Sequence, residues 1–324
     1  MQGRTVLLTG GNSGIGLECS RVLVREGCRV LIASRDRPAS EAVARDLGAR
    51  HGSGCAEALT LDLSDSTSVR TLARDIERRG LPLDALVCNA GLQFTRGPVH
   101  NRDGFEATFA VNHLGHFLLA NLLLERLAAD APARIVVVSS AVHDPRRFTG
   151  MPHARIDGID DLAREGGTTR GRFDGRRAYV NSKLCNLWFA YELARRIEAA
   201  GLARADRPIA VNAFDPGLVP GSGLARDYPT TLRAAWNHVL PVATAPLRPF
   251  FSTISTLARS GAELARLVLD PGRGDAGARY YASHTRWRES VSSRLSYDGA
   301  RAAELWKASV RLSGLEPRES PFAT

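Results

Sequence analysis

Short, almost uninterrupted apolar runs alternate along this chain with longer segments whose apolar residues recur at helical spacing. The apolar runs predict strands at 4–9, 29–33, 58–61, 85–88, 135–138, 209–214 and 279–281. The periodic segments predict helices at 14–26, 40–47, 66–79, 105–127, 179–200 and 261–269. Strands that are apolar on both faces and separated by amphipathic helices are typical of a parallel sheet covered on both sides. The pattern therefore predicts a single α/β domain over residues 1–312, with a doubly wound parallel sheet flanked by helices.

Three segments interrupt this alternation. Residues 143–177 are rich in Arg, Gly and Asp, residues 222–256 combine prolines with aromatic and leucine side chains, and the tail at 313–324 is polar. Long insertions in a compact domain are commonly lids over a ligand. We therefore expect the two insertions to cover a substrate and the tail to be flexible.

Composition and cysteine spacing narrow the class of protein. The 324 residues are 44% hydrophobic and 24% charged, with both kinds interspersed, which excludes a disordered chain, a collagen or a coiled coil. The five cysteines have no spacing typical of a disulfide framework or a zinc site. Residues 1–4 lead straight into an apolar strand, and no run of about 18 apolar residues follows, so we expect neither a signal peptide nor a membrane-spanning helix. A cytoplasmic protein without a metal site fits these features best.

The net charge of +9, from 43 Lys+Arg against 34 Asp+Glu, admits an anionic partner. Nearly all of the positive charge is arginine scattered among acids, without a basic stripe interleaved with aromatics, so nucleic-acid binding is not expected. Peripheral membrane contact is a weaker hypothesis than core packing or an oligomer contact, because prolines argue against a continuous amphipathic helix in 222–256. The residues that would carry it are Arg233, Trp236, Leu240, Leu247, Arg248, Phe250 and Phe251.

A glycine-rich turn stands where the strand at 4–9 passes into the helix at 14–26. Gly10 permits a tight turn, Gly14 lets the backbone approach a pyrophosphate, and Gly16 lets the helix pack closely on its strand. The helix N-terminus adds free N–H groups and the positive end of its dipole. The turn therefore predicts a Rossmann-type dinucleotide site. Its expected contacts are Gly10, Asn12, Ser13, Gly14, Ile15 and Gly16.

The end of the second strand bears on the choice of cofactor. A site specific for NAD usually presents an acid there to the ribose 2′-OH, whereas a 2′-phosphate requires a cation. Ser34 and Arg35 fit NADP, while Asp36 follows at once and would take the role of the acid. We expect NADP, with NAD as the alternative.

Tyr179 and Lys183 lie four residues apart in the helix at 179–200 and share one of its faces. A phenol is a poor acid at neutral pH until a nearby ammonium stabilises its phenolate. The pair suits general acid–base catalysis at a carbonyl or alcohol oxygen. An exposed helix pair without a catalytic role is the alternative.

With these motifs in this order, the chain from Arg4 to about Tyr281 resembles the short-chain dehydrogenase/reductases. The resemblance implies catalytic roles for Asn112, Ser140, Tyr179 and Lys183, with Ser139 as the alternative serine. Tyr179 and Lys183 are also expected to touch the cofactor. Further cofactor contacts are implied for Asp62, Leu63, Asn89, Ala90, Gly91, Pro216 and Gly217.

The same resemblance implies a mechanism. Ser140 and Tyr179 hold the carbonyl oxygen while the nicotinamide passes a hydride to the carbon, and Tyr179 then gives up its proton. Lys183 binds the nicotinamide ribose and lowers the pKa of the tyrosine, and Asn112 holds a water that links Lys183 to solvent. The threonine that often follows the family's Pro-Gly turn is not obvious here, and Ser222 is the candidate replacement.

Residues 9–18, 111–119 and 181–186 resemble retinol dehydrogenases, protochlorophyllide reductases and bacterial polyketide ketoreductases, including the anthracycline type. All of these act on bulky apolar molecules, so the resemblance implies a large hydrophobic ketone, aldehyde or alcohol as substrate. Protochlorophyllide reductases carry a cysteine directly after the Pro-Gly turn, where this chain has Leu218, which weakens that alternative. Retinol oxidation stays open. A non-catalytic cofactor sensor is disfavoured because all four catalytic positions are present.

Three histidines, His113, His116 and His143, lie near the expected site without a set of metal-ligand partners. We interpret them as helix-face or pocket-lining residues, with His143 a candidate substrate contact. Relatives often form dimers or tetramers through the helices at 105–127 and 179–200, whereas insertions can block such packing. A homo-oligomer is therefore one alternative.

Overall fold

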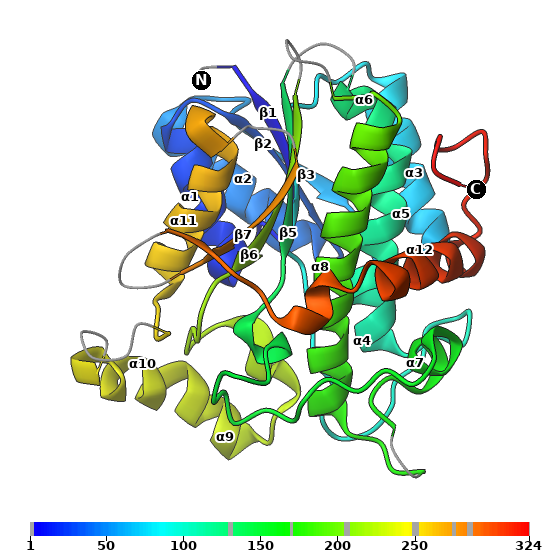
Figure 1. Cartoon of the computed structure of the whole chain (residues 1–324). Helices are drawn as coiled ribbons and strands as arrows, with labels where there is room; N and C mark the ends of the chain where they lie inside the picture. The colour runs from blue at the N-terminus through cyan, green and yellow to red at the C-terminus, as the bar shows by residue number, and fades with distance from the viewer. Residues whose placement is uncertain are drawn as a thin grey trace.

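The computed structural model describes residues 3–128, 132–168, 171–203, 208–247, 253–273, 277–283 and 288–323. Its strands form one sheet in the order β3-β2-β1-β4-β5-β6-β7-β8 (Figure 1). The strands are β1 (Thr5–Thr9), β2 (Arg29–Ser34), β3 (Ala56–Thr60), β4 (Ala85–Cys88), β5 (Ala133–Val138), β6 (Ile209–Asp215), β7 (Gly277–Ala282) and β8 (Arg288–Ser290). All neighbours pair in parallel except β7 and β8. The predicted doubly wound parallel sheet is confirmed, and the short antiparallel β8 is an addition to it.

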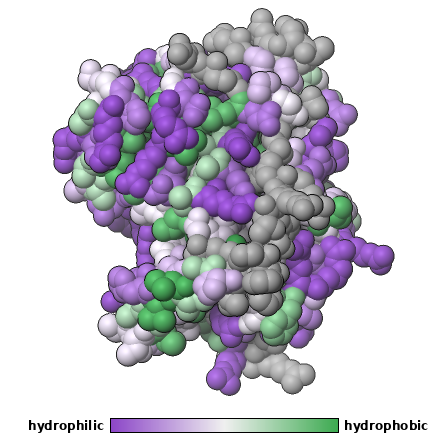
Figure 2. Space-filling view, turned by 90° about the vertical axis from the view of Figure 1, so that its left-hand side faces the viewer, coloured by the Kyte–Doolittle hydropathy of each residue, from purple (hydrophilic) through white to green (hydrophobic). Residues whose placement is uncertain are grey.

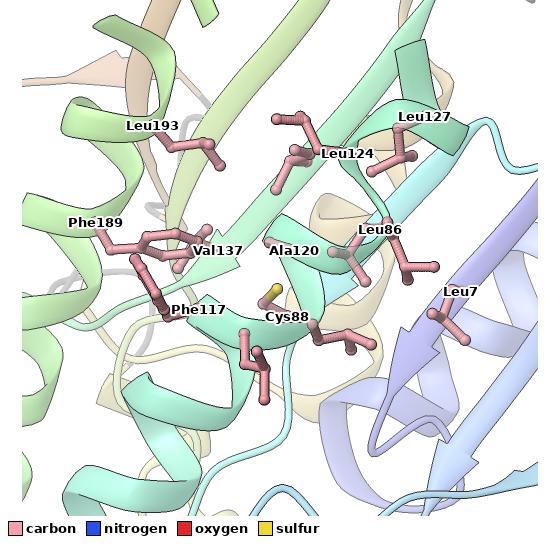
Figure 3. Close-up of a cluster of buried hydrophobic side chains, with 14 of the residues drawn as sticks. Leu7, Leu86, Cys88, Phe117, Ala120, Leu124, Leu127, Val137, Phe189 and Leu193 are labelled. Atoms are coloured by element: carbon pink, nitrogen blue, oxygen red, sulfur yellow. The ribbon is translucent and has the colours of Figure 1, made fainter. Parts of the chain in front are cut away.

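Helices cover both faces of this sheet (Figure 1). One face carries α1 (Gly14–Arg25), α2 (Arg37–His51) and α11 (Leu257–Leu269). The other carries α3 (Ser66–Arg78), α5 (Gly115–Leu122), α8 (Gly175–Ala199) and α12 (Gly299–Ser313). Successive side chains of β1 pack on opposite faces of the sheet: Leu7 belongs to one buried cluster, and Val6 and Leu8 belong to the other. Figure 3 shows the first cluster, in which Phe117 and Phe189 lie over the sheet residues.

The helix predicted at 105–127 is divided. It consists of α4 (Ala107–Phe109), a π-helical turn η1 (Ala110–Leu114), α5 and α6 (Leu124–Ala128). The π turn contains Asn112 and is followed by Gly115, where an added Cβ would lie only 2.2 Å from the carbonyl oxygen of Leu63. The glycine therefore lets this helix approach the loop after β3, and π turns of this kind are frequent at functional sites.

A single turn, η2 (Ala141–His143), leads into the first insertion, which contains α7 (Ile159–Glu165), and α7 packs against α12. The second contains the turn η3 (Gly223–Asp227), then α9 (Thr230–Ala234), a π turn η4 (Ala235–Val239) and α10 (Leu240–Ala243), followed by η5 (Ala245–Leu247). This second insertion lies beyond the carboxyl ends of the strands (Figure 1).

Two expectations about the second insertion fail for its residues from Thr230 to Ala243. The run through α9, η4 and α10 is helical from Thr230 to Ala243, although Pro241 stands within it. Core packing does not hold for this run either, since none of its residues is buried and Leu232, Val239 and Val242 are largely exposed. Figure 1 draws α9 and α10 at the bottom of the molecule, and Figure 2 shows several hydrophobic residues, in green, at the surface of this lower part. Arg248, Phe250 and Phe251 lie outside the described residues.

The polar tail is packed and not frayed, which corrects the prediction of a flexible segment at 313–324. Leu315 and Phe322 are buried in the same cluster as Trp306 of α12. The indole Nε1 of Trp306 donates to the carbonyl oxygen of Phe322 at 3.0 Å, and Arg70 pairs with Glu319 at 2.8 Å. The few apolar residues of the tail are therefore enough to hold it against α12.

Of the helices in the described ranges, none is long and apolar enough to cross a membrane. The five cysteines are free thiols. The same described residues contain no cluster of three or more His, Cys, Asp or Glu side chains suited to holding a metal ion.

Candidate functional site

A cavity of about 950 Å³ opens at the carboxyl ends of the parallel strands. Every predicted cofactor contact lines it: Gly10, Asn12, Ser13, Gly14, Ile15, Gly16, Ser34, Arg35, Asp62, Leu63, Asn89, Ala90, Gly91, Tyr179, Lys183, Pro216 and Gly217. Ser140 lines it as well, whereas Asn112 does not. The chain order places the cavity where β1 and β4 lie side by side although β2 and β3 come between them in sequence, which is where doubly wound sheets bind ligands.

The glycine turn fits a dinucleotide phosphate. Gly10 and Gly14 have φ of +67° and +57°, which side chains rarely tolerate. A Cβ on Gly16 would lie 2.2 Å from the carbonyl oxygen of Gly10, so the start of α1 packs directly on the turn. Ser13, the residue before α1, makes no capping hydrogen bond with its side chain. The first N–H groups of α1 are therefore left to face an anion.

At the far end of the cavity, Arg35 and Asp36 have different environments. The carboxylate of Asp36 caps α2 by accepting from the backbone N–H of Ala39 at 3.0 Å. Arg35 is exposed, and among the described residues no carboxylate forms an ion pair with it. Asp62 accepts from the backbone N–H and the hydroxyl of Ser64, which holds its carboxylate at the rim of the cavity.

Tyr179 and Lys183 lie on one face of α8, and both are buried. The Lys183 Nζ lies 5.3 Å from the centre of the Tyr179 ring and donates to the carbonyl oxygen of Val138 at 3.1 Å. Burial lowers the pKa of Lys183 from 10.5 to about 8. Burial, and then the charge of Asp215, raise the pKa of Tyr179 above its ordinary value. The pair is thus not the exposed helix pair of the alternative, and its phenol is held in the protonated form.

The two serines after β5 have different surroundings. The Ser139 hydroxyl is buried and donates to the carbonyl oxygen of Lys183 at 2.7 Å. Ser140 is half-buried beside the cavity, and none of the described residues forms a hydrogen bond with its hydroxyl. A substrate oxygen in the cavity would therefore meet the hydroxyl of Ser140 rather than that of Ser139.

Asn112 is fully buried behind the cavity. Its Oδ1 accepts from the backbone N–H of Leu92 at 2.8 Å, and its Nδ2 donates to the carbonyl oxygen of Leu92 and to the Ser182 hydroxyl, both at 3.0 Å. The side chain joins the loop after β4 to α8. Both N–H groups of the Asn112 amide are thus engaged within the protein, and its main-chain carbonyl oxygen lies 3.2 Å from Nδ1 of His116.

His143 is not a substrate contact, which corrects that expectation. It is buried and does not line the cavity. Its Nε2 accepts from the backbone N–H of Ser293 at 3.1 Å, so Nδ1 carries the proton and donates to the carbonyl oxygen of Ser140. The ring therefore holds the backbone of Ser140 against a segment 150 residues away in sequence.

The other two histidines lie in the interior. His116 Nε2 is 2.9 Å from the hydroxyl of Thr9, and His113 Nε2 is 2.8 Å from the hydroxyl of Ser309. Burial lowers the pKa of His113 to about 3 and that of His116 to about 4, so both rings are neutral at physiological pH.

The remaining walls of the cavity come mainly from the two insertions. Arg147, Phe148 and Met151 belong to the first, and Ser222, Leu224, Arg226, Tyr228 and Trp236 belong to the second. The sequence pattern does not single out Arg226, because it is one arginine among many. Its position at the rim could be found only from the fold.

Comparisons with known proteins agree with this geometry. Residues 4–151 match the model of the short chain dehydrogenase family. The chain is 34% identical to retinol dehydrogenase 13 of Homo sapiens, over 99% of this chain and 88% of that protein. It is 33% identical to the chloroplastic protochlorophyllide reductase A of Oryza sativa subsp. japonica, over 96% and 80%.

One solved structure, of an uncharacterised protein from Mycobacterium paratuberculosis, aligns with a TM-score of 0.67 and 31% identity, over 97% of this chain and 94% of that one. The similarity thus covers nearly the whole chain. The chain belongs to the short-chain dehydrogenase/reductase family of oxidoreductases, in its retinol dehydrogenase-like branch.

Proposed function

We propose that the protein is an NADP(H)-dependent oxidoreductase that reduces a ketone or aldehyde of a bulky hydrophobic molecule, or oxidises the corresponding alcohol. One observation carries the proposal. The phosphate-binding turn and the buried Tyr179–Lys183 pair open into the same cavity, so a dinucleotide bound along the turn would bring its nicotinamide end toward the phenol.

The preference for NADP rests on the end of β2. A 2′-phosphate needs a cation with free donors, and Arg35 lines the cavity without a carboxylate partner among the described residues. The acid that would serve NAD, Asp36, already caps α2.

The residues divide the chemistry as follows. The nicotinamide, when bound, supplies or receives the hydride. Ser140 and Tyr179 hold the carbonyl oxygen, and Tyr179, whose pKa is raised by burial, donates the proton to that oxygen. The Lys183 ammonium lies close enough to the phenol to stabilise the phenolate that this step leaves.

The substrate half of the cavity supports a large apolar substrate. Its apolar lining includes Val142, Phe148, Met151, Leu218, Leu224 and Trp236. Such walls bind by removing apolar surface from water and leave Ser140 and Tyr179 to orient the carbonyl. Leu218 offers no thiol proton, which speaks against reduction of a carbon–carbon double bond by the protochlorophyllide route.

The test is an anaerobic fluorescence titration with NADPH and NADH, followed by a panel of aromatic polyketide ketones, retinal and protochlorophyllide. We expect tighter binding of NADPH and its oxidation by a carbonyl compound in the dark. Consumption of NADPH only with protochlorophyllide under light would replace carbonyl reduction with the photochemical reaction. Tighter binding of NADH would overturn the cofactor assignment, and binding of neither cofactor would overturn the whole proposal.

A further inference from the structure

Two neighbouring side chains attach the turn η3 to two different loops of the fold. The Nη2 of Arg226 donates to the hydroxyl of Ser13, in the glycine turn, at 3.0 Å. The Oδ2 of Asp227 accepts from the backbone N–H of Thr95 at 2.7 Å, from the Thr95 hydroxyl at 3.1 Å and from the backbone N–H of Arg96 at 3.2 Å. The turn η3 is thus a strap that runs from the loop after β4 to the loop after β1.

The two attachments differ in strength. Asp227 has three donors, and Arg96 returns two bonds to the strap, to the carbonyl oxygens of Asp227 and Tyr228. Hydrogen bonds to a carboxylate also lower the pKa of Asp227, so this end stays charged and anchored. Arg226 has one bond to an uncharged hydroxyl, and no carboxylate among the described residues forms an ion pair with it. The arginine end is therefore the end that an anion can still occupy.

The Arg226 guanidinium lies where it does because residue 223 is a glycine. A Cβ on Gly223 would lie 2.7 Å from both Nε and Nη2 of Arg226, so the guanidinium packs flat against the glycine. From there it faces the start of α1, a helix of 12 residues whose first N–H groups receive no side-chain cap from Ser13. A cation with unused donors and the positive end of a helix dipole converge on one point of the cavity.

We propose that Arg226 is a ligand of the cofactor's diphosphate and that this bond holds the strap closed. The proposal rests on the proposed function, since it assumes that a dinucleotide lies along the glycine turn. An arginine fork matches phosphate oxygens geometrically, and a bond between two opposite charges is stronger than the present bond of the guanidinium to an uncharged hydroxyl. Leu224 belongs to the strap, Tyr228 directly follows it and Trp236 lies in η4, and all three line the cavity. Closure of the strap on the cofactor therefore completes the substrate wall.

The first experiment measures dissociation constants by fluorescence titration of NADPH, using the wild type, Arg226→Gln and Arg226→Lys. Arg233→Gln is the matched control, because Arg233 is an exposed arginine of α9 that does not line the cavity. We expect Arg226→Gln to weaken NADPH binding about ten- to a hundredfold. The dissociation constant of Arg226→Lys should fall between those of the wild type and Arg226→Gln, because lysine keeps the charge without the planar fork. Arg233→Gln should leave the dissociation constant unchanged.

Adenosine 2′-monophosphate, which has no diphosphate, distinguishes the loss of a contact to the cofactor's diphosphate from general damage to the site. Its affinity, measured by displacement or calorimetry, should be the same in the wild type and Arg226→Gln. An equal loss for both ligands would make Arg226 merely structural and overturn the proposal. Unchanged NADPH binding in Arg226→Gln would overturn it as well, while the proposed function would stand. If the wild type binds neither dinucleotide, the proposed function itself fails.

Hydrogen exchange tests the closure. Amides of residues 222–247 should become protected when NADPH binds the wild type but not when saturating NADPH binds Arg226→Gln. Amides of α1 should become protected in both proteins. Equal protection of 222–247 in both would show that the strap closes without Arg226 and would contradict this part of the proposal.

Discussion

At the scale of single residues, burial sets the chemistry of the candidate site. Tyr179 and Lys183 are both nearly inaccessible to solvent, and burial shifts their pKa values in opposite directions toward the neutral forms. The phenol is therefore a proton donor at neutral pH. The ammonium of Lys183 keeps its charge at a cost that its bond to Val138 only partly offsets.

Removing the Tyr179 hydroxyl should abolish turnover. In Tyr179→Phe we expect the rate of carbonyl reduction to fall at least about 100-fold, because the proton donor is lost. NADPH binding should stay nearly intact. Tyr191→Phe is the control, since Tyr191 lies on the same helix but its hydroxyl bonds with Ser292 outside the cavity. Steady-state kinetics of both variants decide the matter, and a wild-type rate in Tyr179→Phe would refute the assigned acid.

The stability of the protein should depend on pH through Lys183. Its pKa is about 8 when folded against 10.5 in the unfolded chain, so between these values the unfolded state binds more protons. The free energy of unfolding of the wild type, relative to Lys183→Met, should therefore rise with pH across this window, by about 1.4 kcal/mol per unit. Below pH 8 the difference should be constant. Urea denaturation of both proteins at pH 7, 8, 9 and 10 measures it, and a flat difference would contradict the prediction.

At the scale of elements, close approaches decide where glycine is required. Gly16 lies within α1, where a side chain would strike the carbonyl oxygen of Gly10, and Gly115 gives the π-turned helix the same freedom beside Leu63. Gly48 lies inside α2 with open space around it. Close contacts therefore require glycine at positions 16 and 115, whereas no contact requires it at position 48.

Substitution by alanine should separate the two kinds of glycine. Gly16→Ala should destabilise the fold by about 1–3 kcal/mol, because Gly10 must move, and should weaken cofactor binding. Gly48→Ala should stabilise the protein by about 0.5–1 kcal/mol, because α2 can accept a methyl group without a clash. Thermal or urea unfolding of the two variants measures both effects, and a stabilised Gly16→Ala would show that the turn is not tightly packed.

At the scale of the whole molecule, the C-terminal tail packs against the helices α5 and α12. Phe322 lies at 6.2 Å from the Trp306 ring, edge to face, and the tail also bonds with α5 through Ser320 and Asn121. Segments from α3, α5, α12 and the C-terminal end thus share one buried cluster.

Loss of a tail contact should consequently act as loss of a core contact. Phe322→Ala should lower the free energy of unfolding by about 3 kcal/mol, because it opens a cavity beside Trp306. Phe148→Ala is the matched control, since the Phe148 side chain is fully exposed, and it should change stability by less than about 0.5 kcal/mol. Equal unfolding midpoints for the two variants would mean that the tail is not part of the core.

The sequence predicted those features whose signal is local. Alternating apolar runs and helical periodicity were enough for the seven parallel strands and most helices, because each element expresses its own burial pattern. The glycine turn and the Tyr179–Lys183 pair could be predicted for the same reason. The backbone conformation of the turn and the helix face that Tyr179 and Lys183 share both depend on neighbours in sequence. With the family resemblance, they sufficed for the fold class and for the residues on the cofactor side of the cavity.

Tertiary structure decided what depends on residues far apart. Ser139 and Ser140 are equivalent in sequence, and only the packing of β5 against α8 commits the first hydroxyl to Lys183 and leaves the second at the cavity. The role of His143 depends on Ser293, that of Arg226 on Ser13, and the order of the polar tail on Trp306. Such contacts leave no periodic trace along the chain, because hydrogen bonds and burial between distant segments arise only once the sheet has brought those segments together.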